Sequence, residues 1–247
     1  MKYTCTITAL VALITIYSCK QTKEPDTFEK IADYYPLTVG KSITYRMDSS
    51  NYVGYTTTPL VTSYFIKDSV HALITDNMNR PSYRIFRFIK KNMTDPVWQP
   101  NSTYFVTPLS NTLEYIENNL RYVKLLNPIA NDNSWKGNNY IETSGPNSQL
   151  QYLQDWDYQY TDVGTAKTYN GLTFAQTATV KQVDKTDGDS TVVSGYSERN
   201  ISVEVYGKGV GLLHKNFLHW IYQPPTVNGT PGYRAGYGIR LTIVARN

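Results

Sequence analysis

The chain closes on Gly238-Ile239-Arg240-Leu241-Thr242-Ile243-Val244-Ala245-Arg246, which is its most regular alternation of side chains. One side of this segment carries Ile239, Leu241, Ile243 and Ala245, and the other carries Arg240, Thr242, Val244 and Arg246. Successive side chains of a β-strand point to opposite faces, so the pattern predicts a strand with one face toward a core. We expect both ends of the domain to be paired into sheets.

Similar runs recur upstream at short intervals, separated by turn-forming residues. Strands are predicted at 42–47, 60–67, 69–75, 82–90, 102–107, 150–162, 172–183, 190–194, 201–206 and 217–222. Asp76 to Pro81 predicts a hairpin turn, Asp187-Gly188 a two-residue hairpin turn, and Gly207 to Gly211 a tight bend or bulge. About a dozen strands with few helical patterns predict one antiparallel all-β domain, either a sandwich or a partly open barrel. Few or no helices are expected outside the first 18 residues.

Residues 111–126 fit two patterns. Leu113, Ile116, Leu120 and Val123 recur at helical spacing, but 112–116 and 120–125 also read as two strands around a turn at 117–119. Because strands are expected on both sides, the hairpin is favoured over the helix.

The first 19 residues resemble a bacterial lipoprotein signal. Lys2 precedes an uncharged, mostly apolar run that ends at Ser18-Cys19 and is short for a membrane span. The resemblance implies cleavage before Cys19 and acylation of its thiol, and an ordinary signal peptide is the alternative. We therefore expect a signal peptide at 1–18, a polar tether at 19–33 with at most one helical turn, and a single all-β domain at 34–247.

Charge and cysteine content narrow the possible partners. The formal net charge is +4, and no cluster of basic residues exceeds Lys90-Lys91, so a nucleic-acid partner is not expected. Cys5 and Cys19 are the only cysteines, which leaves the predicted domain without a disulfide or a cysteine metal site. The sequence predicts no cofactor and no metal.

Three stretches resemble a group of uncharacterised exported lipoproteins that is common in the Bacteroidota. They are 34–45 (Tyr-Tyr-Pro-Leu-Thr-Val-Gly-Lys-Ser-Ile-Thr-Tyr), 134–138 (Ser-Trp-Lys-Gly-Asn) and 206–212 (Tyr-Gly-Lys-Gly-Val-Gly-Leu). The sequence departs from the group at Ile43, where Trp is usual, and at Gly207, where Ala is usual. The resemblance implies one domain, lipid attachment and a place in the cell envelope, but it implies no activity.

Aromatic residues supply the candidate contact surface. The chain has 22 Tyr against 7 Phe and 4 Trp, and tyrosine suits strands because its ring packs while its hydroxyl stays wet. Trp98, Trp135 and Trp156 lie in or near predicted loops, where they could stack on a sugar or dock a partner. Aromatic side chains are nevertheless more often part of a core than of a site.

Carboxylates supply the alternative, an envelope hydrolase acting on glycans. Asp155 and Asp157 flank Trp156 and would share one face of a strand, as paired carboxylates do in glycosidases. Neighbouring acids on one strand are more often a solvated face. The aspartates around Gly188 lack an EF-hand pattern, and His214 and His219 are five residues apart, which places them on opposite faces of a strand.

The sequence as a whole favours a non-catalytic binding or assembly module held at the membrane by acylated Cys19, with a glycan or an envelope protein as possible partner. No nucleophile motif is present, so no catalytic residue is predicted. The outer membrane is the expected location, and the sequence leaves open which face of it the domain occupies.

Overall fold

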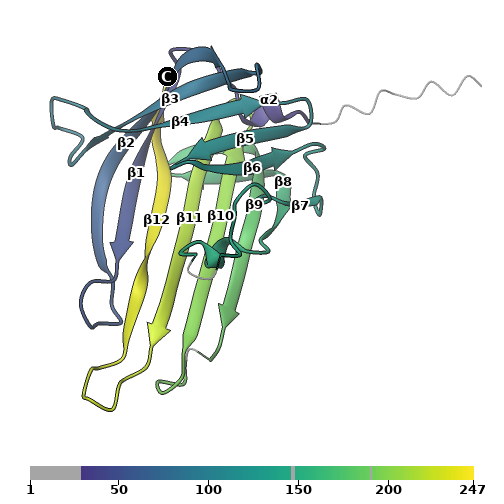
Figure 1. The fold of residues 1–247 in the computed structure, drawn as a ribbon. Helices are drawn as coiled ribbons and strands as arrows, with labels where there is room; N and C mark the ends of the chain where they lie inside the picture. Colours follow the sequence, from purple (N-terminus) through teal and green to yellow (C-terminus); the bar gives the residue numbers. More distant parts are fainter. Residues whose placement is uncertain (1–28, 146–147, 190) are drawn as a thin grey trace, which may run out of the picture.

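A computed structural model describes residues 29–145, 148–189 and 191–247, and within them the chain forms one antiparallel sheet of twelve strands (Figure 1). Neighbours in the sheet follow the order β6-β5-β4-β3-β2-β1-β12-β11-β10-β9-β8-β7. The prediction of a single all-β domain is confirmed, and the architecture is a partly open barrel rather than a sandwich. Cys19 and the predicted signal peptide lie outside the described residues.

The strands vary in length from three to sixteen residues. Their bounds are β1 Ser42–Asn51, β2 Leu60–Thr75, β3 Pro81–Lys90, β4 Gln99–Pro108, β5 Thr112–Glu117, β6 Leu120–Leu126, β7 Ser134–Lys136, β8 Asp157–Tyr169, β9 Leu172–Asp187, β10 Ser197–Gly207, β11 Gly211–Gln223 and β12 Tyr233–Arg246. Two short helices accompany them in the described chain, α2 (Ile31–Tyr34) and the 3-10 turn η2 (Gln151–Leu153).

The closing strand lies at the centre of the sheet. β12 pairs with β1 on one side and with β11 on the other, so the two ends of the domain are joined as predicted. Ile239 and Leu241 face the barrel interior, and Ile243 is fully buried. The alternation of apolar and polar residues thus identified the inner face of this strand correctly.

Several local predictions are confirmed by the pairing. Residues 111–126 form the β5–β6 hairpin rather than a helix, and the turn at Asp76–Pro81 joins β2 to β3. The bend at Gly207–Gly211 joins β10 to β11, with Gly209 and Gly211 at positive φ, a conformation that glycine adopts at little cost. The predicted strands at 60–67 and 69–75 are one strand, β2, with an irregularity at His71.

Three local predictions are wrong. The predicted strand at 150–162 begins only at Asp157, because η2 and a positive φ at Asp155 interrupt its first part. Residues 191–194 form turns instead of a strand, so Gly188 belongs to a longer loop and not to a two-residue hairpin. Ser134–Lys136, expected in a loop, is the edge strand β7.

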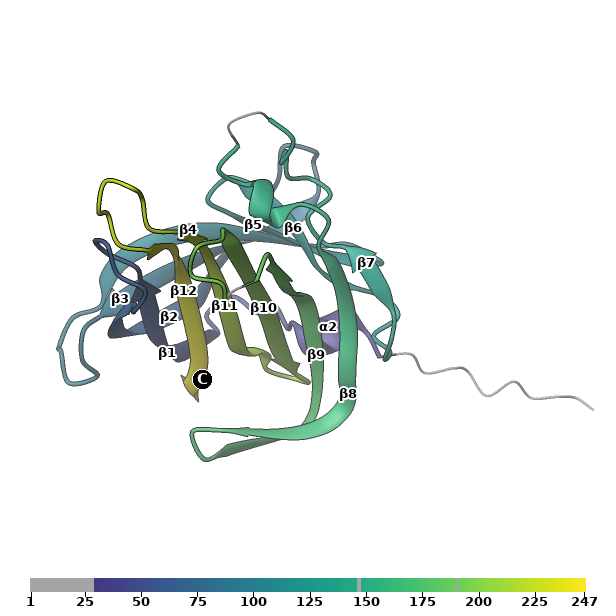
Figure 2. The ribbon, with the colours of Figure 1, turned by 90° about the horizontal axis from the view of Figure 1, so that it is seen from below.

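The barrel closes where the two edge strands, β6 and β7, meet (Figure 2). Within the described chain this seam has one backbone hydrogen bond, from Val123 N–H in the middle of β6 to the carbonyl of Gly137 just after β7, at 2.8 Å. Side chains supply further bonds. The Trp135 indole donates to the Val123 carbonyl (2.7 Å), and the Tyr160 hydroxyl donates to Leu126 O and accepts from Leu126 N–H (3.0 and 2.9 Å).

The far ends of β8 and β9 fold around the outside of the barrel (Figure 2). Bulges near Asp162 and Gly164, both at positive φ, bend this hairpin. Its tip lies against β11 and β12, where Tyr169 stacks on His214 and the Asn170 amide donates to Ile243 O at 2.7 Å.

Helix α2 lies across the predicted boundary between tether and domain. Ile31 and Tyr34 are buried, and Gly209 N–H in the β10–β11 turn donates to the carbonyl of Asp33 at 2.6 Å. None of the helices in the described parts of the chain is long and apolar enough to cross a membrane.

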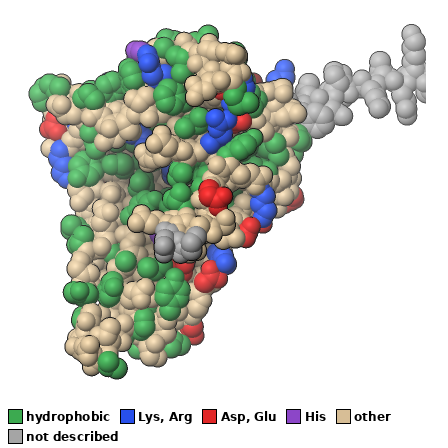
Figure 3. Space-filling model, viewed as in Figure 1, with side chains coloured by type: hydrophobic (Ala, Val, Ile, Leu, Met, Phe, Trp, Pro, Cys, Tyr) green, Lys and Arg blue, Asp and Glu red, His purple; other side chains and the backbone are tan. Residues whose placement is uncertain are grey.

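The end of the barrel remote from α2 is formed by the β1–β2, β9–β10 and β11–β12 loops (Figure 1). Residues 52–59 and 224–232 contain no charged side chain. The space-filling view shows apolar side chains scattered over this part of the surface among uncharged polar ones (Figure 3). Val193 and Val227 are among the most exposed of them.

Candidate functional site

Six charged side chains meet inside the barrel, and together we call them the interior belt. Each comes from a different strand: Asp68 (β2), Arg87 (β3), Glu117 (β5), Lys124 (β6), Glu204 (β10) and Lys215 (β11). Their side chains are between 3% and 22% exposed, which is unusual for ionised residues unless they are paired.

Strand register places two of the belt pairs directly opposite each other. Asp68 is the cross-strand partner of Arg87, and the guanidinium binds both carboxylate oxygens, at 2.7 and 2.8 Å. Arg87 also donates to Glu117 at 3.2 Å. On the other side of the barrel Glu204 lies opposite Lys215, with Oε1 and Nζ 3.8 Å apart.

Lys124 links the two halves of the barrel. Its ammonium donates to Glu204 Oε1 at 2.7 Å, although 80 residues separate them in the sequence. It also lies over the rings of Tyr115 and Tyr122, which adds cation–π attraction. The second oxygen of Glu204 accepts from Gln182 (2.9 Å) and Tyr206 (2.6 Å).

These contacts determine the protonation states in the belt. Burial alone would raise the pKa of Glu204, but Lys124, Lys215 and its hydrogen bonds lower that pKa below its ordinary value. Burial lowers the pKa of Lys124, and Glu204 opposes the change. Burial would also lower the pKa of Arg87, but Asp68 raises it well above the usual value. We conclude that Glu204 and Arg87 remain ionised.

Two cavities adjoin the belt, and Arg87, Glu117, Lys124 and Lys215 line both of them. The upper cavity, of about 70 Å³, lies toward α2 and is lined mainly by tyrosines and aliphatic residues: Tyr35, Tyr45, Tyr104, Tyr115, Tyr206, Ile43, Val70 and Ile85. The lower cavity, of about 170 Å³, lies toward η2 and is lined by aromatic and apolar residues: Tyr122, Tyr152, Trp156, Tyr158, Phe217, Tyr237, Met47 and Ile239.

Three tyrosine hydroxyls in the upper cavity have hydrogen-bonding capacity to spare. Tyr35, Tyr104 and Tyr115 have no hydrogen-bond partner among the described side chains and backbone. Burial, followed by the carboxylates of Asp68 and Glu117, raises the pKa of Tyr104 and Tyr115 well above the usual value. These hydroxyls are therefore neutral groups that can donate to a ligand.

The element η2 covers the lower cavity from one side. Tyr152 stacks on His219, with ring centroids 4.0 Å apart, and its hydroxyl lies 3.2 Å from that of Tyr237. The carbonyl of Tyr152 accepts the indole N–H of Trp156 at 2.6 Å. These contacts fix one wall of the cavity.

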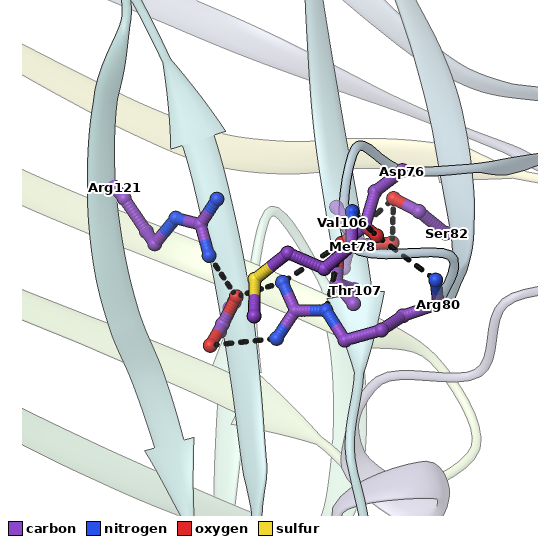
Figure 4. A network of polar contacts seen from close by, with 8 residues as sticks. Asp76, Met78, Arg80, Ser82, Val106, Thr107 and Arg121 are labelled. Carbon is purple, nitrogen blue, oxygen red and sulfur yellow. Dashed lines mark hydrogen bonds and ion pairs between the residues drawn. The ribbon is translucent and has the colours of Figure 1, made fainter.

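A second charged cluster lies on the outer face of the barrel (Figure 4). Its central carboxylate has its hydrogen-bonding capacity already used by neighbouring side chains. The buried carboxylate of Glu114 accepts from Arg80 (2.9 Å) and Arg121 (2.8 Å), and Arg80 also binds Asp76 at 2.8 Å. Beside it, Thr107 donates to Ser82, which donates to Val106 O. This cluster joins the β2–β3 turn to β5 and β6 and borders neither interior cavity.

The structure separates the three tryptophans that the sequence suggested as contact residues. Trp98 is on the outer surface, with the ammonium groups of Lys67 and Lys90 over its ring. Trp135 is packed at the seam against Tyr158 and Tyr160. Trp156 is 4% exposed and lines the lower cavity, so it alone of the three lines an interior cavity.

The paired carboxylates also lie elsewhere. Asp155 and Asp157 are exposed, and Asp157 forms a surface ion pair with Lys136 at 2.9 Å. Asp155 contributes to a shallow polar hollow on the outside together with Lys136, Asn138 and Gln154. Neither carboxylate lines the upper or the lower cavity.

Histidines and metal ligands do not converge in the described part of the chain. His214 stacks on Tyr169 at the outer surface, whereas His219 stacks on Tyr152, so the two face opposite sides of β11 as expected. Among the described residues, no group of three or more His, Cys, Asp or Glu side chains could hold a metal ion.

Comparison with known proteins adds no assignment. No protein-family model matches the sequence, and no curated protein matches it either.

Proposed function

We propose that this protein is a non-catalytic binding module of the cell envelope that holds a small ligand inside its partly open barrel. The observation that carries the proposal is the interior belt, whose charged and hydroxyl groups keep unused hydrogen-bonding capacity beside two cavities. A buried ion pair costs several kcal/mol per ion in desolvation and is often no more stabilising than apolar residues of similar volume. Six buried charges therefore contribute little to the stability of the fold, but they are well suited to recognising a ligand.

The lining argues for binding rather than catalysis. Neither histidine nor cysteine is among the described residues that line the two cavities, so a histidine-activated nucleophile has no counterpart there. The aromatic walls and a few convergent polar groups are the usual features of a ligand pocket.

The binding part of the proposal is tested by a screen of glycans, lipids and small organic acids against the full-length chain, paired with turnover assays on the same compounds. We expect binding without turnover. Turnover that disappears in Asp155→Asn or Asp157→Asn would favour the glycan hydrolase instead. If the screen gives neither binding nor turnover, an interaction with another envelope protein replaces ligand binding.

The location is a separate part of the proposal and rests on the sequence. The charged and apolar segments before Ser18-Cys19 support lipid attachment at Cys19, and two or more acyl chains would hold the domain stably at a membrane. We propose the outer membrane as its location. Metabolic lipid labelling and membrane pelleting of the native chain and Cys19→Ala provide the test, and equal labelling of both would exclude acylation at Cys19.

A further inference from the structure

The belt offers a ligand more donors than acceptors. Lys215 has three N–H groups, and its nearest carboxylate oxygen, Glu204 Oε1, is 3.8 Å away, beyond hydrogen-bond distance. That oxygen already accepts from Lys124, and the other oxygen of Glu204 accepts from Gln182 and Tyr206. Lys215 therefore has unused donors that its carboxylate neighbour does not occupy.

Arg87 adds to this excess. Its guanidinium has five N–H groups, and the structure shows bonds from Nε and Nη2 to Asp68 and from Nη1 to Glu117. Arg87 lines both cavities, and the neutral hydroxyls of Tyr104 and Tyr115 belong to residues that line the upper one. An acceptor-rich ligand group would satisfy these donors.

The donors around the lower cavity favour an anion. Three cations, Arg87, Lys124 and Lys215, line it, against the single carboxylate of Glu117. Asp68 and Glu204 bind two of these cations from behind. The six belt charges sum to zero, so the unoccupied donors and not the net charge favour an anion. The three nearby carboxylates would repel a dianion such as a phosphate monoester more strongly than a monoanion.

The size and walls of the lower cavity suggest the body of the ligand. A cavity of about 150 Å³ in another protein is large enough to bind benzene, and the lower cavity is of about 170 Å³. Tyr122, Trp156 and Phe217 provide flat faces along its walls. A single six-membered ring fits this space.

We infer that the barrel binds a small monoanionic carboxylate with a ring-sized, partly apolar body, its carboxylate near Lys215 and its ring in the lower cavity. This inference rests on the proposed function and specifies the ligand class for the same site. A carboxylate beside Lys215 would receive charge-assisted hydrogen bonds, which are stronger than those between neutral groups.

Benzoate and benzamide are the matched probes, because they share shape and ring but differ in charge. Isothermal titration of the full-length chain is expected to show benzoate binding at least about tenfold tighter than benzamide. Lys215→Met is expected to weaken benzoate binding by a similar factor and to leave benzamide binding unchanged. Lys215→Arg retains the charge and should retain most of the benzoate affinity.

Lys185→Met is the matched control, because Lys185 is an exposed lysine paired with Asp187 outside the barrel. It should leave benzoate affinity unchanged. Equal affinities for benzoate and benzamide, or full benzoate affinity in Lys215→Met, would overturn the inference. Tighter binding of phenyl phosphate than of benzoate would overturn the choice of a monoanion.

The outcomes separate this inference from the proposed function. If benzoate does not bind but a glycan or lipid from the wider screen does, the ligand class is wrong and the binding function stands. If nothing in either experiment binds, both fail.

Discussion

Glu204 holds the interior belt together, because its two carboxylate oxygens accept hydrogen bonds from Lys124, Gln182 and Tyr206. Lys124 reaches it from the opposite side of the barrel, so the pair joins strands that are far apart in the sheet order. Removing one member of such a pair leaves the other charge buried without compensation. The free-energy cost of removing one partner is therefore larger than the net stabilisation that the intact pair provides.

We predict that Glu204→Gln lowers the free energy of unfolding by about 3–5 kcal/mol at neutral pH. The double variant Glu204→Gln with Lys124→Met should recover part of the loss, because it removes the uncompensated ammonium. Urea unfolding followed by circular dichroism measures both. Asp157→Ala, which breaks an exposed ion pair, is the control and should change stability by at most about 1 kcal/mol. Equal stability of Glu204→Gln and the native chain would show that the loss of the Glu204 carboxylate leaves no uncompensated charge in the belt.

The same carboxylate predicts a pH dependence. The pKa of Glu204 is lower in the folded protein than its ordinary value of 4.5, so folding favours the ionised form. The stabilisation is fully present above pH 4.5 and is lost as the pH falls through the lower, folded-state pKa. The stability difference between the native chain and Glu204→Gln should therefore be constant above pH 4.5 and shrink below it. A difference that widens toward acid pH would contradict this assignment.

Sequence reasoning missed the belt because its members come from six strands and share no local motif. A local signal does exist in Ile201-Ser202-Val203-Glu204-Val205-Tyr206. In this segment Ser202 and Glu204 are more deeply buried than their apolar neighbours Ile201 and Val203. A polar inner face is typical of a strand that lines a site, and only the closure of the barrel reveals which face is inner.

Among the elements, the seam between β6 and β7 decides whether the sheet is closed. We predict that Tyr160→Phe lowers the free energy of unfolding by about 1–3 kcal/mol, because Leu126 N–H and C=O both lose a partner. Urea unfolding gives the stability change, and hydrogen exchange at the Leu126 amide reports local opening. Tyr196→Phe, which removes an exposed hydroxyl bound to Glu198, should stay within about 0.5 kcal/mol of the native chain. Unchanged stability and Leu126 exchange in Tyr160→Phe would mean that the seam is held by other contacts.

Contacts at the seam also give structural roles to several residues of the stretch 134–138, one of the three that carry the family resemblance. Trp135 and Gly137 bind Val123 across the seam, and a Cβ on Gly137 would overlap the Tyr158 ring. Asn138 donates to Leu153 O and accepts from the Tyr158 hydroxyl. The sequence located this stretch but suggested a loop, because a three-residue edge strand leaves no alternation to detect. Element type was predictable where alternation continued without interruption, as in β12, and was not in a strand of three residues.

At the scale of the whole molecule, β12 joins two meanders. Strands β1–β6 form one arm of the sheet and β7–β11 the other, and β12 pairs with β1 and β11 between them. The interior belt draws members from both sides of β12: Asp68, Arg87, Glu117 and Lys124 on the first arm, and Glu204 and Lys215 on the second. Four belt residues thus belong to the first arm and two to the second. The site exists only if both arms are held in one barrel.

We predict that truncation after Gly238 abolishes cooperative folding. It removes Ile239 to Asn247, and with them Leu241 and Ile243 of the core and the pairing of β12 with most of β1. The two arms would then expose unpaired inner strand edges, which favour aggregation. Deleting Asn247 alone is the matched control, because it removes only the bonds of the last residue to Ser42 and Gly40. Thermal unfolding followed by circular dichroism should show one sharp transition for the control and none for the longer truncation. A truncated chain that melts as sharply as the native one would show that β12 is dispensable and that the two arms fold without their central strand.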